Sequence, residues 1–101
     1  MRSFRPVCRV EELAPGAGRL VEIDGKAIAL FNVDGSFHAI EDHCLHAGGP
    51  LHEGRLEGRI VACPWHEWKF DVATGACDLN PKVSLHCYPV RVRDGVVEIE
   101  A

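Results

Sequence analysis

The sequence Cys44-Leu45-His46-Ala47-Gly48-Gly49-Pro50, followed further along the chain by Cys63-Pro64-Trp65-His66, places two Cys/His pairs in short segments. The spacing is C-x-H-x16-C-x-x-H. Glycine and proline around the two pairs predict tight turns, so each pair lies on a loop. Thiolates and imidazoles together are ligands for zinc and for iron–sulfur clusters. The two loops therefore predict a metal site, and the donor types alone leave both metals open.

The order of the ligands separates the two possibilities. A structural zinc site with two cysteines and two histidines usually takes the cysteines from one half of its motif and the histidines from a helix in the other half. Here each loop mixes the two residue types, and no helical pair of histidines follows. In a two-iron cluster, the two cysteines can bind one iron and the two histidines the other, so that each loop gives one ligand to each iron. The pattern favours a two-iron cluster.

Strand-like runs separated by glycine turns flank the loops on both sides. Aspartate–glycine pairs at 24–25, 34–35 and 94–95 are signals of two-residue β-hairpin turns. Three such hairpins predict an all-β fold, an antiparallel sandwich or barrel. The strands expected from this pattern are Phe4–Val10, Gly18–Ile23, Lys26–Asn32, Ser36–Glu41, Tyr88–Arg93 and Val96–Glu100.

The last hairpin has a regular apolar pattern, whereas the middle of the chain is rich in loop residues. Val90, Val92, Val97 and Ile99 alternate along the last hairpin, which predicts that one face of it is buried. Between about residues 42 and 83, glycine, proline and loop residues dominate, with short apolar pieces at 60–62 and 70–72. Because both ligand loops lie there, we expect a small inserted metal-binding subdomain within a single domain spanning residues 1–101.

Composition narrows the function classes. The 101 residues are 47% hydrophobic and 26% charged, which is ordinary for a globular domain. A formal net charge of −4 disfavours nucleic acid and anionic membranes as partners. No apolar run approaches the length of a membrane span, and the first residues lack the apolar region of a signal peptide. We expect a cytoplasmic protein.

The chain has five cysteines, and this odd number argues against a complete disulfide framework; two of the five belong to the ligand loops. Cys8, Cys77 and Cys87 are expected to be buried as small hydrophobic residues. A Cys77–Cys87 disulfide is the less favoured alternative, because disulfides are rare in the cytosol.

The chain resembles the small Rieske-type ferredoxins of bacterial ring-hydroxylating oxygenase systems. The resemblance is carried by residues 44–51 and 63–71, and extends to Thr74-Gly75 and to Tyr88-Pro89-Val90. It implies a Rieske-type fold and one [2Fe–2S] cluster per chain. Carried over residue by residue, it makes Cys44 and Cys63 ligands of the inner iron. His46 and His66 become ligands of the outer iron, near the surface.

Departures from the wider family refine this expectation. Rieske proteins of respiratory complexes have a disulfide between the loops, and Gly49 and Trp65 stand at those positions. High-potential members have hydroxyl donors where this chain has Trp68 and Phe70. Hydrogen bonds to the cluster stabilise its reduced form, so their loss predicts a potential near the low end of the Rieske range, about −150 mV. Glu67 replaces a common glycine, either at a cost of about 1 kcal/mol if its φ is positive or as an ordinary exposed residue.

The remaining polar residues carry simpler interpretations. Asp42 is expected to cap a turn rather than to act as a base. The four other histidines are expected to be structural or exposed, namely His38, His43, His52 and His86. No paired carboxylates or nucleophile–base set is evident, and no 2-His-1-carboxylate region for a mononuclear iron.

The resemblance implies an electron carrier rather than an enzyme. It would pass single electrons from an NAD(P)H-dependent flavin reductase to a terminal oxygenase, as a monomer. Contacts would be transient, through Leu45, His46, Pro64, Trp65 and His66. The first alternative is the small Rieske subunit of an assimilatory nitrite reductase. The second is a zinc-stabilised or purely structural interaction module.

Overall fold

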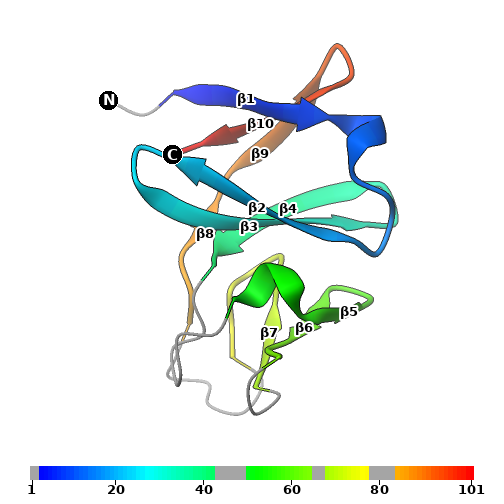
Figure 1. Cartoon of the computed structure of the whole chain (residues 1–101), viewed down its shortest axis with the longest axis vertical. Helices are drawn as coiled ribbons and strands as arrows, with labels where there is room; N and C mark the ends of the chain where they lie inside the picture. The colour runs from blue at the N-terminus through cyan, green and yellow to red at the C-terminus, as the bar shows by residue number, and fades with distance from the viewer. Residues whose placement is uncertain (1–2, 43–49, 65–67, 78–83) are drawn as a thin grey trace.

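The computed structural model describes residues 3–42, 50–64, 68–77 and 84–101, and residues 1–2, 43–49, 65–67 and 78–83 lie outside this description. The described residues form ten strands in three antiparallel sheets (Figure 1). Their helices are two single turns of 3-10 helix, η1 (Val10–Glu12) and η2 (Leu51–Glu53), neither of which is long enough to cross a membrane.

The aspartate–glycine turns form as predicted. Strands β2 (Gly18–Ile23), β3 (Lys26–Val33) and β4 (Ser36–Glu41) are joined by two of them, and β9 (Val90–Arg93) and β10 (Val96–Glu100) by the third. At each turn the aspartate has φ near +50° and the following glycine has a larger positive φ. Positive φ at both central residues is the type I′ geometry, whose twist matches that of paired antiparallel strands.

The strands assemble into three layers. The first sheet has the order β1 (Phe4–Arg9), β10, β9, and the second has the order β2, β3, β4, β8 (Cys87–Tyr88). The third sheet consists of β5 (Arg55–Glu57), β6 (Ile60–Ala62) and β7 (Lys69–Asp71). Figure 1 shows the second sheet between the other two, with the third sheet beneath it.

Strand β3 explains this stacking, because both of its faces are buried. Ile28 and Leu30 contribute to one apolar cluster, and Ala29 and Phe31 to another. All four side chains are 0% exposed. Since successive side chains of a strand point to opposite faces, the second sheet must be covered on both sides. The first sheet covers one side with Val97 and Ile99, and the third covers the other with Val61 and Phe70.

Apart from shifts of one residue at the ends of β1 and β3, two details differ from the sequence prediction. The strand expected over Tyr88–Arg93 is interrupted at Pro89, so that β8 pairs with β4 while β9 pairs with β10. Proline has no N–H to continue a ladder, and the chain passes there from one sheet to another. The expected buried face is found in β10, but Val92 is 50% exposed because β9 is the edge strand of its sheet.

Candidate metal centre

One of the four predicted ligands, Cys63, lies among the described residues. Cys44, His46 and His66 lie outside them, as do Gly49, Trp65, Glu67 and His43. Cys63 and the segments that lead into and out of the two loops form the described part of the centre.

These segments meet at one end of the third sheet. Arg55 pairs with Ala62, and Ala62 pairs with Lys69. The first ligand loop returns through η2 to the start of β5 at Arg55, and the second loop runs from Ala62 to Lys69. Neighbouring antiparallel strands run in opposite directions. The start of β5, the end of β6 and the start of β7 therefore lie at the same end of the third sheet, and these are the points where the first loop ends and the second loop begins and ends. The fold thus brings the described segments that flank the two predicted loops to one place.

Cys63 is held from two sides. Its side chain is 1% exposed and belongs to the apolar cluster that also contains Val61 and Phe70. Its N–H donates a hydrogen bond of 2.7 Å to the Trp68 carbonyl oxygen, which closes the base of the second loop. Apolar side chains shield the Cys63 sulfur, a soft donor, from water, which is a suitable environment for a cluster ligand. The described part of the donor set therefore fits a [2Fe–2S] cluster.

The exit of the first loop packs against the entry of the second. Leu51, the first residue of η2, is fully buried in the same apolar cluster as Cys63. Gly54 lies so close to β6 that a Cβ atom there would stand 2.2 Å from the Ala62 carbonyl oxygen. A groove at this junction is lined by Glu53, Gly54, Arg55, Ala62, Cys63 and Pro64. Leu51 ends the first stretch that carries the family resemblance, whereas Gly54 has no such signal in the sequence.

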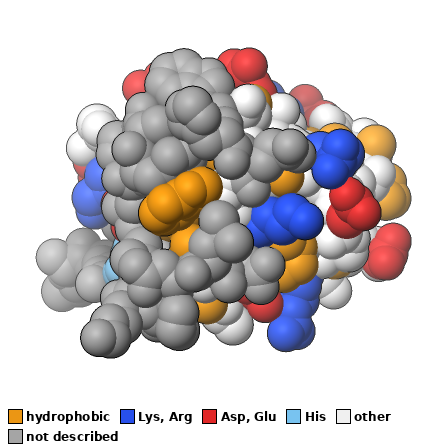
Figure 2. Space-filling model, turned by 90° about the horizontal axis from the view of Figure 1, so that it is seen from below, with side chains coloured by type: hydrophobic (Ala, Val, Ile, Leu, Met, Phe, Trp, Pro, Cys, Tyr) orange, Lys and Arg blue, Asp and Glu red, His pale blue; other side chains and the backbone are white. Residues whose placement is uncertain are grey.

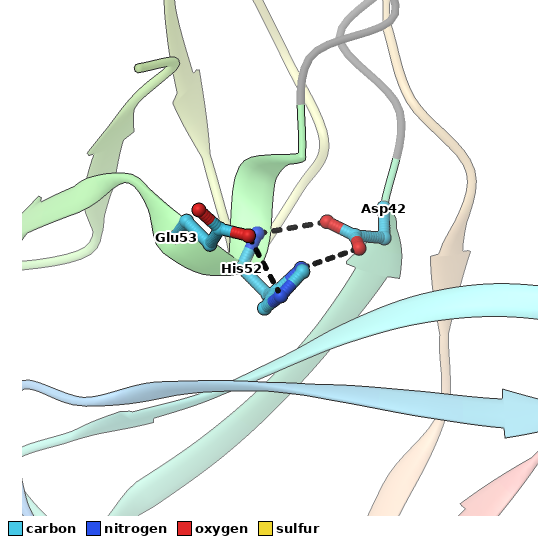
Figure 3. Close-up of polar contacts among 3 residues, drawn as sticks. All are labelled: Asp42, His52 and Glu53. Atoms are coloured by element: carbon cyan, nitrogen blue, oxygen red, sulfur yellow. Dashed lines mark hydrogen bonds and ion pairs between the residues drawn. The ribbon is translucent and has the colours of Figure 1, made fainter.

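Asp42 and His52 join the two ends of the first loop (Figure 3). Asp42 Oδ1 accepts a 2.7 Å hydrogen bond from the His52 backbone N–H, and Oδ2 lies 2.6 Å from His52 Nδ1. Asp42 is expected from the sequence to cap a turn at the start of the loop; its carboxylate instead accepts from the second residue of η2, ten residues further along the chain. The role of His52 is structural, as predicted.

The other candidate residues have ordinary surroundings. His38 is half-buried, and His86 is exposed with its ring edge-on to Tyr88. Among the described residues, no group of three or more histidine, cysteine, aspartate or glutamate side chains could hold a metal ion. In the part of the chain that the structure describes, nothing competes with the two loops as a metal site.

The cysteines outside the loops are free thiols in the described structure, so the Cys77–Cys87 disulfide is not formed. Cys8 and Cys77 are buried as predicted, while Cys87 is only half-buried. Burial raises the pKa of the Cys8 thiol, and burial together with the Asp71 charge raises the pKa of the Cys87 thiol. Both thiols are therefore protonated at neutral pH and are poor nucleophiles.

Neither residue at the expected hydroxyl positions supplies a hydroxyl. Phe70 is fully buried in the apolar cluster around Cys63, and Trp68 is half-buried against the same cluster. The described surroundings of Cys63 are accordingly apolar on this side.

Comparisons with known proteins agree with this arrangement. The Rieske [2Fe-2S] domain family matches residues 3–89. The biphenyl dioxygenase ferredoxin subunit of Pseudomonas sp. (strain KKS102) is 40% identical over 100 residues, which cover 95% of this chain and 92% of that protein.

Two solved structures are similar in fold. One is a complex of reduced oxygenase and oxidized ferredoxin in carbazole 1,9a-dioxygenase, with a TM-score of 0.89 and 33% identity over 96% of this chain and 92% of that chain. The other is a putative NADH-dependent nitrite reductase small subunit from Mycobacterium tuberculosis. It has a TM-score of 0.92 and 30% identity, and the match covers 100% of this chain and 96% of that chain.

Proposed function

The chain belongs to the Rieske [2Fe-2S] domain family, and we propose on that basis that it is an electron carrier whose cluster is held by Cys44, His46, Cys63 and His66. The cofactor is a Rieske-type [2Fe–2S] cluster, which supplies a one-electron couple when bound. Cys44 and Cys63 hold the inner iron, and His46 and His66 hold the outer iron. The burial of Cys63 supports its assignment to the inner iron.

The observation that carries the proposal is the nearly full-length similarity to a dioxygenase ferredoxin subunit. The proposed donor is an NAD(P)H-dependent flavin reductase, and the proposed acceptor is a terminal oxygenase. The carbazole dioxygenase complex supports the second partner, because its name places a ferredoxin together with an oxygenase. This chain itself transfers electrons and catalyses no substrate reaction. We propose that it works as a cytoplasmic monomer, without nucleic acid or membrane partners.

The surface near the loops suits brief contacts with such partners. Pro64, Arg55 and Lys69 are exposed at the loop-bearing end of the third sheet. Figure 2 views the molecule from this end and shows hydrophobic and basic side chains next to one another on its described part. A small mixed patch of this kind is typical of transient redox contacts.

Reconstitution tests the carrier proposal. The purified holoprotein is mixed with NADH and the flavin reductase and oxygenase of a biphenyl dioxygenase system, and the visible absorption of the cluster is followed. We expect the absorption to bleach on adding reductase and to return on adding oxygenase with its substrate and dioxygen. A cluster that the reductase reduces but that no ring-hydroxylating oxygenase reoxidises would contradict the proposal.

The second candidate is the small subunit of a nitrite reductase, which the similarity to the mycobacterial subunit favours. Such a subunit would form a lasting complex with a large catalytic subunit. Affinity purification from the native host separates the two functions. A stoichiometric nitrite-reducing complex would support the second candidate, and a chain that purifies alone supports the carrier.

We predict a reduction potential near the low end of the Rieske range, about −150 mV. Phe70 and Trp68 offer no hydroxyl to the cluster, and an apolar surrounding disfavours the more negative reduced state. Redox titration of the holoprotein, followed by circular dichroism in the visible range, measures this value. Trp68→Ser, which places a hydroxyl at this position, should raise the potential. A wild-type value above about +100 mV would show that the cluster has donors other than these positions.

A further inference from the structure

A single carboxylate joins the two ends of the first ligand loop. Asp42 directly follows β4, where the chain enters the loop, and His52 lies in η2, where the chain leaves it. The two hydrogen bonds between them measure 2.7 and 2.6 Å, from the His52 backbone N–H to Oδ1 and between Nδ1 and Oδ2 (Figure 3). An ionised carboxylate only accepts hydrogen bonds, so the second bond requires the proton on Nδ1.

This contact is shielded from solvent. The Asp42 side chain is 4% exposed and the His52 side chain is 21% exposed. A buried carboxylate that loses its donors keeps the cost of its burial, which makes both bonds hard to give up in the closed loop. Glu53 lies at the edge of the group, 3.6 Å from His52 Nε2 and with a side chain 64% exposed. Its contribution to the contact is therefore minor.

Each partner is also fixed to the body of the fold. The Asp42 N–H donates to the Ala27 carbonyl oxygen at 3.0 Å, which ties the loop entry to β3. Leu51, beside His52, is fully buried among the apolar side chains around Cys63. The carboxylate thus bridges two anchored points, with the segment that carries Cys44 and His46 between them.

The two ligand loops are closed in different ways. The second loop is closed by a backbone hydrogen bond, from the Cys63 N–H to the Trp68 carbonyl. The first loop has the side-chain contact between Asp42 and His52 across its base. Gly49 and Trp65 exclude a disulfide between the loops. Closure of the first loop can therefore be altered by substitutions that leave every proposed ligand in place.

We propose that Asp42 and His52 are positioning residues that hold the first ligand loop closed and so set how long the cluster stays bound. The inference rests on the proposed assignment of Cys44 and His46 as ligands. A cluster leaves when its ligand loop opens, and local opening becomes more frequent when contacts that exist only in the closed form are removed. The contact between Asp42 and His52 is of this kind.

The test measures how fast the holoprotein loses its visible absorption in an excess of iron chelator. His52→Leu removes the side-chain donor, and we expect bleaching to be faster by about tenfold or more, as for the loss of a hydrogen bond to a charged group. His52→Asn keeps an N–H donor at the position of Nδ1, so its rate should stay within about threefold of wild type. Glu53→Gln is the matched control, and its rate should equal that of wild type.

Two further measurements separate this role from general destabilisation. The EPR spectrum of the reduced cluster should be the same in wild type, His52→Leu and His52→Asn, because the ligands are unchanged. Without chelator, unfolding of the holoprotein in urea should be altered much less by His52→Leu than chelator bleaching is. Bleaching that merely follows global unfolding would overturn the inference, and so would a failure of His52→Asn to restore retention.

The outcomes distinguish the inference from the assignment on which it rests. A wild-type protein without a Rieske EPR signal would refute the ligand assignment. Equal bleaching rates in wild type and His52→Leu, both with that signal, would refute only the role of the Asp42–His52 contact. If His52→Leu does not accumulate with a cluster, Asp42→Ala replaces it, since alanine removes both acceptors of the contact. A bleaching rate like that of wild type for Asp42→Ala would overturn the inference.

Discussion

Replacing His66 with alanine is expected to abolish the Rieske spectrum. Alanine has no donor atom, so the outer iron would lose one of the two imidazoles that the proposed ligation gives it. The substitution lies in the second ligand loop, whose base is closed by backbone atoms of Cys63 and Trp68. We therefore expect the chain to fold and the characteristic visible and EPR signals to be lost. Iron content, visible absorption and EPR of the dithionite-reduced protein measure the effect.

His86→Ala is the matched control for this prediction. His86 is exposed, and its ring contacts Tyr88 edge-on, with 4.6 Å between ring centroids. This variant should keep the full spectrum. Retention of the Rieske EPR signal by His66→Ala would show that another residue is the ligand. A colourless wild-type protein that contains zinc instead of iron would contradict the cluster itself, and would favour the zinc-stabilised interaction module.

Much of the fold follows from short-range signals in the sequence. The aspartate–glycine pairs fix the hairpin turns because few residue pairs tolerate positive φ at both central positions. The apolar run of β3 indicates a strand buried on both faces, which requires layers above and below it. Such signals are local, so they can be read from the sequence without knowledge of the tertiary structure.

What the sequence could not predict depends on neighbours that are distant along the chain. Val92 continues the alternation of its hairpin, yet it lies on an edge strand and stays half-exposed. The short strand β5, Arg55–Glu57, has a single apolar residue, Leu56, which is too little to predict a strand; it pairs with β6 in the fold. Burial and pairing of this kind are decided by packing rather than by local preference.

The candidate site shows the same division. The spacing of the proposed ligands Cys44, His46, Cys63 and His66 predicts the cofactor, because the type and order of these residues can be read from the sequence. The residues that support the loops carry no such signature. Asp42 and His52 meet only because β4 ends beside η2, and an isolated Asp–His pair ten residues apart has no motif.

The second large effect is expected at Gly54, where alanine should destabilise the protein and prevent it from retaining its cluster. The Gly54 backbone has φ −73° and ψ 160°, a conformation open to any residue, so backbone strain plays no part. The obstacle is space. A Cβ atom would stand 2.2 Å from the Ala62 carbonyl oxygen and 2.9 Å from a Val61 methyl group.

The clash between a Cβ atom at Gly54 and the Ala62 backbone would displace the segments that lead to the two ligand loops. Ala62 directly precedes Cys63, and Gly54 follows the turn that ends the first loop. Separating them would push the two loops apart at the edge where the fold joins them. We expect a cost of about 3 kcal/mol in the free energy of unfolding, at the upper end for overpacking because the contact is with backbone. Chemical unfolding of the cluster-free protein and iron content after expression measure the two effects.

Gly58→Ala is the matched control for Gly54→Ala. Gly58 lies in the turn between β5 and β6 of the same sheet, with φ +59°, and a Cβ atom there would meet no heavy atom within 4 Å. Alanine at this position meets only backbone strain, at a cost of about 1 kcal/mol, and should leave cluster loading unchanged. If both variants were equally stable and equally loaded, the close approach of Gly54 to Ala62 would not hold the loops together. Because the two positions share a sheet but differ in what a methyl group would touch, a larger loss at Gly54 can be assigned to the junction between the loops.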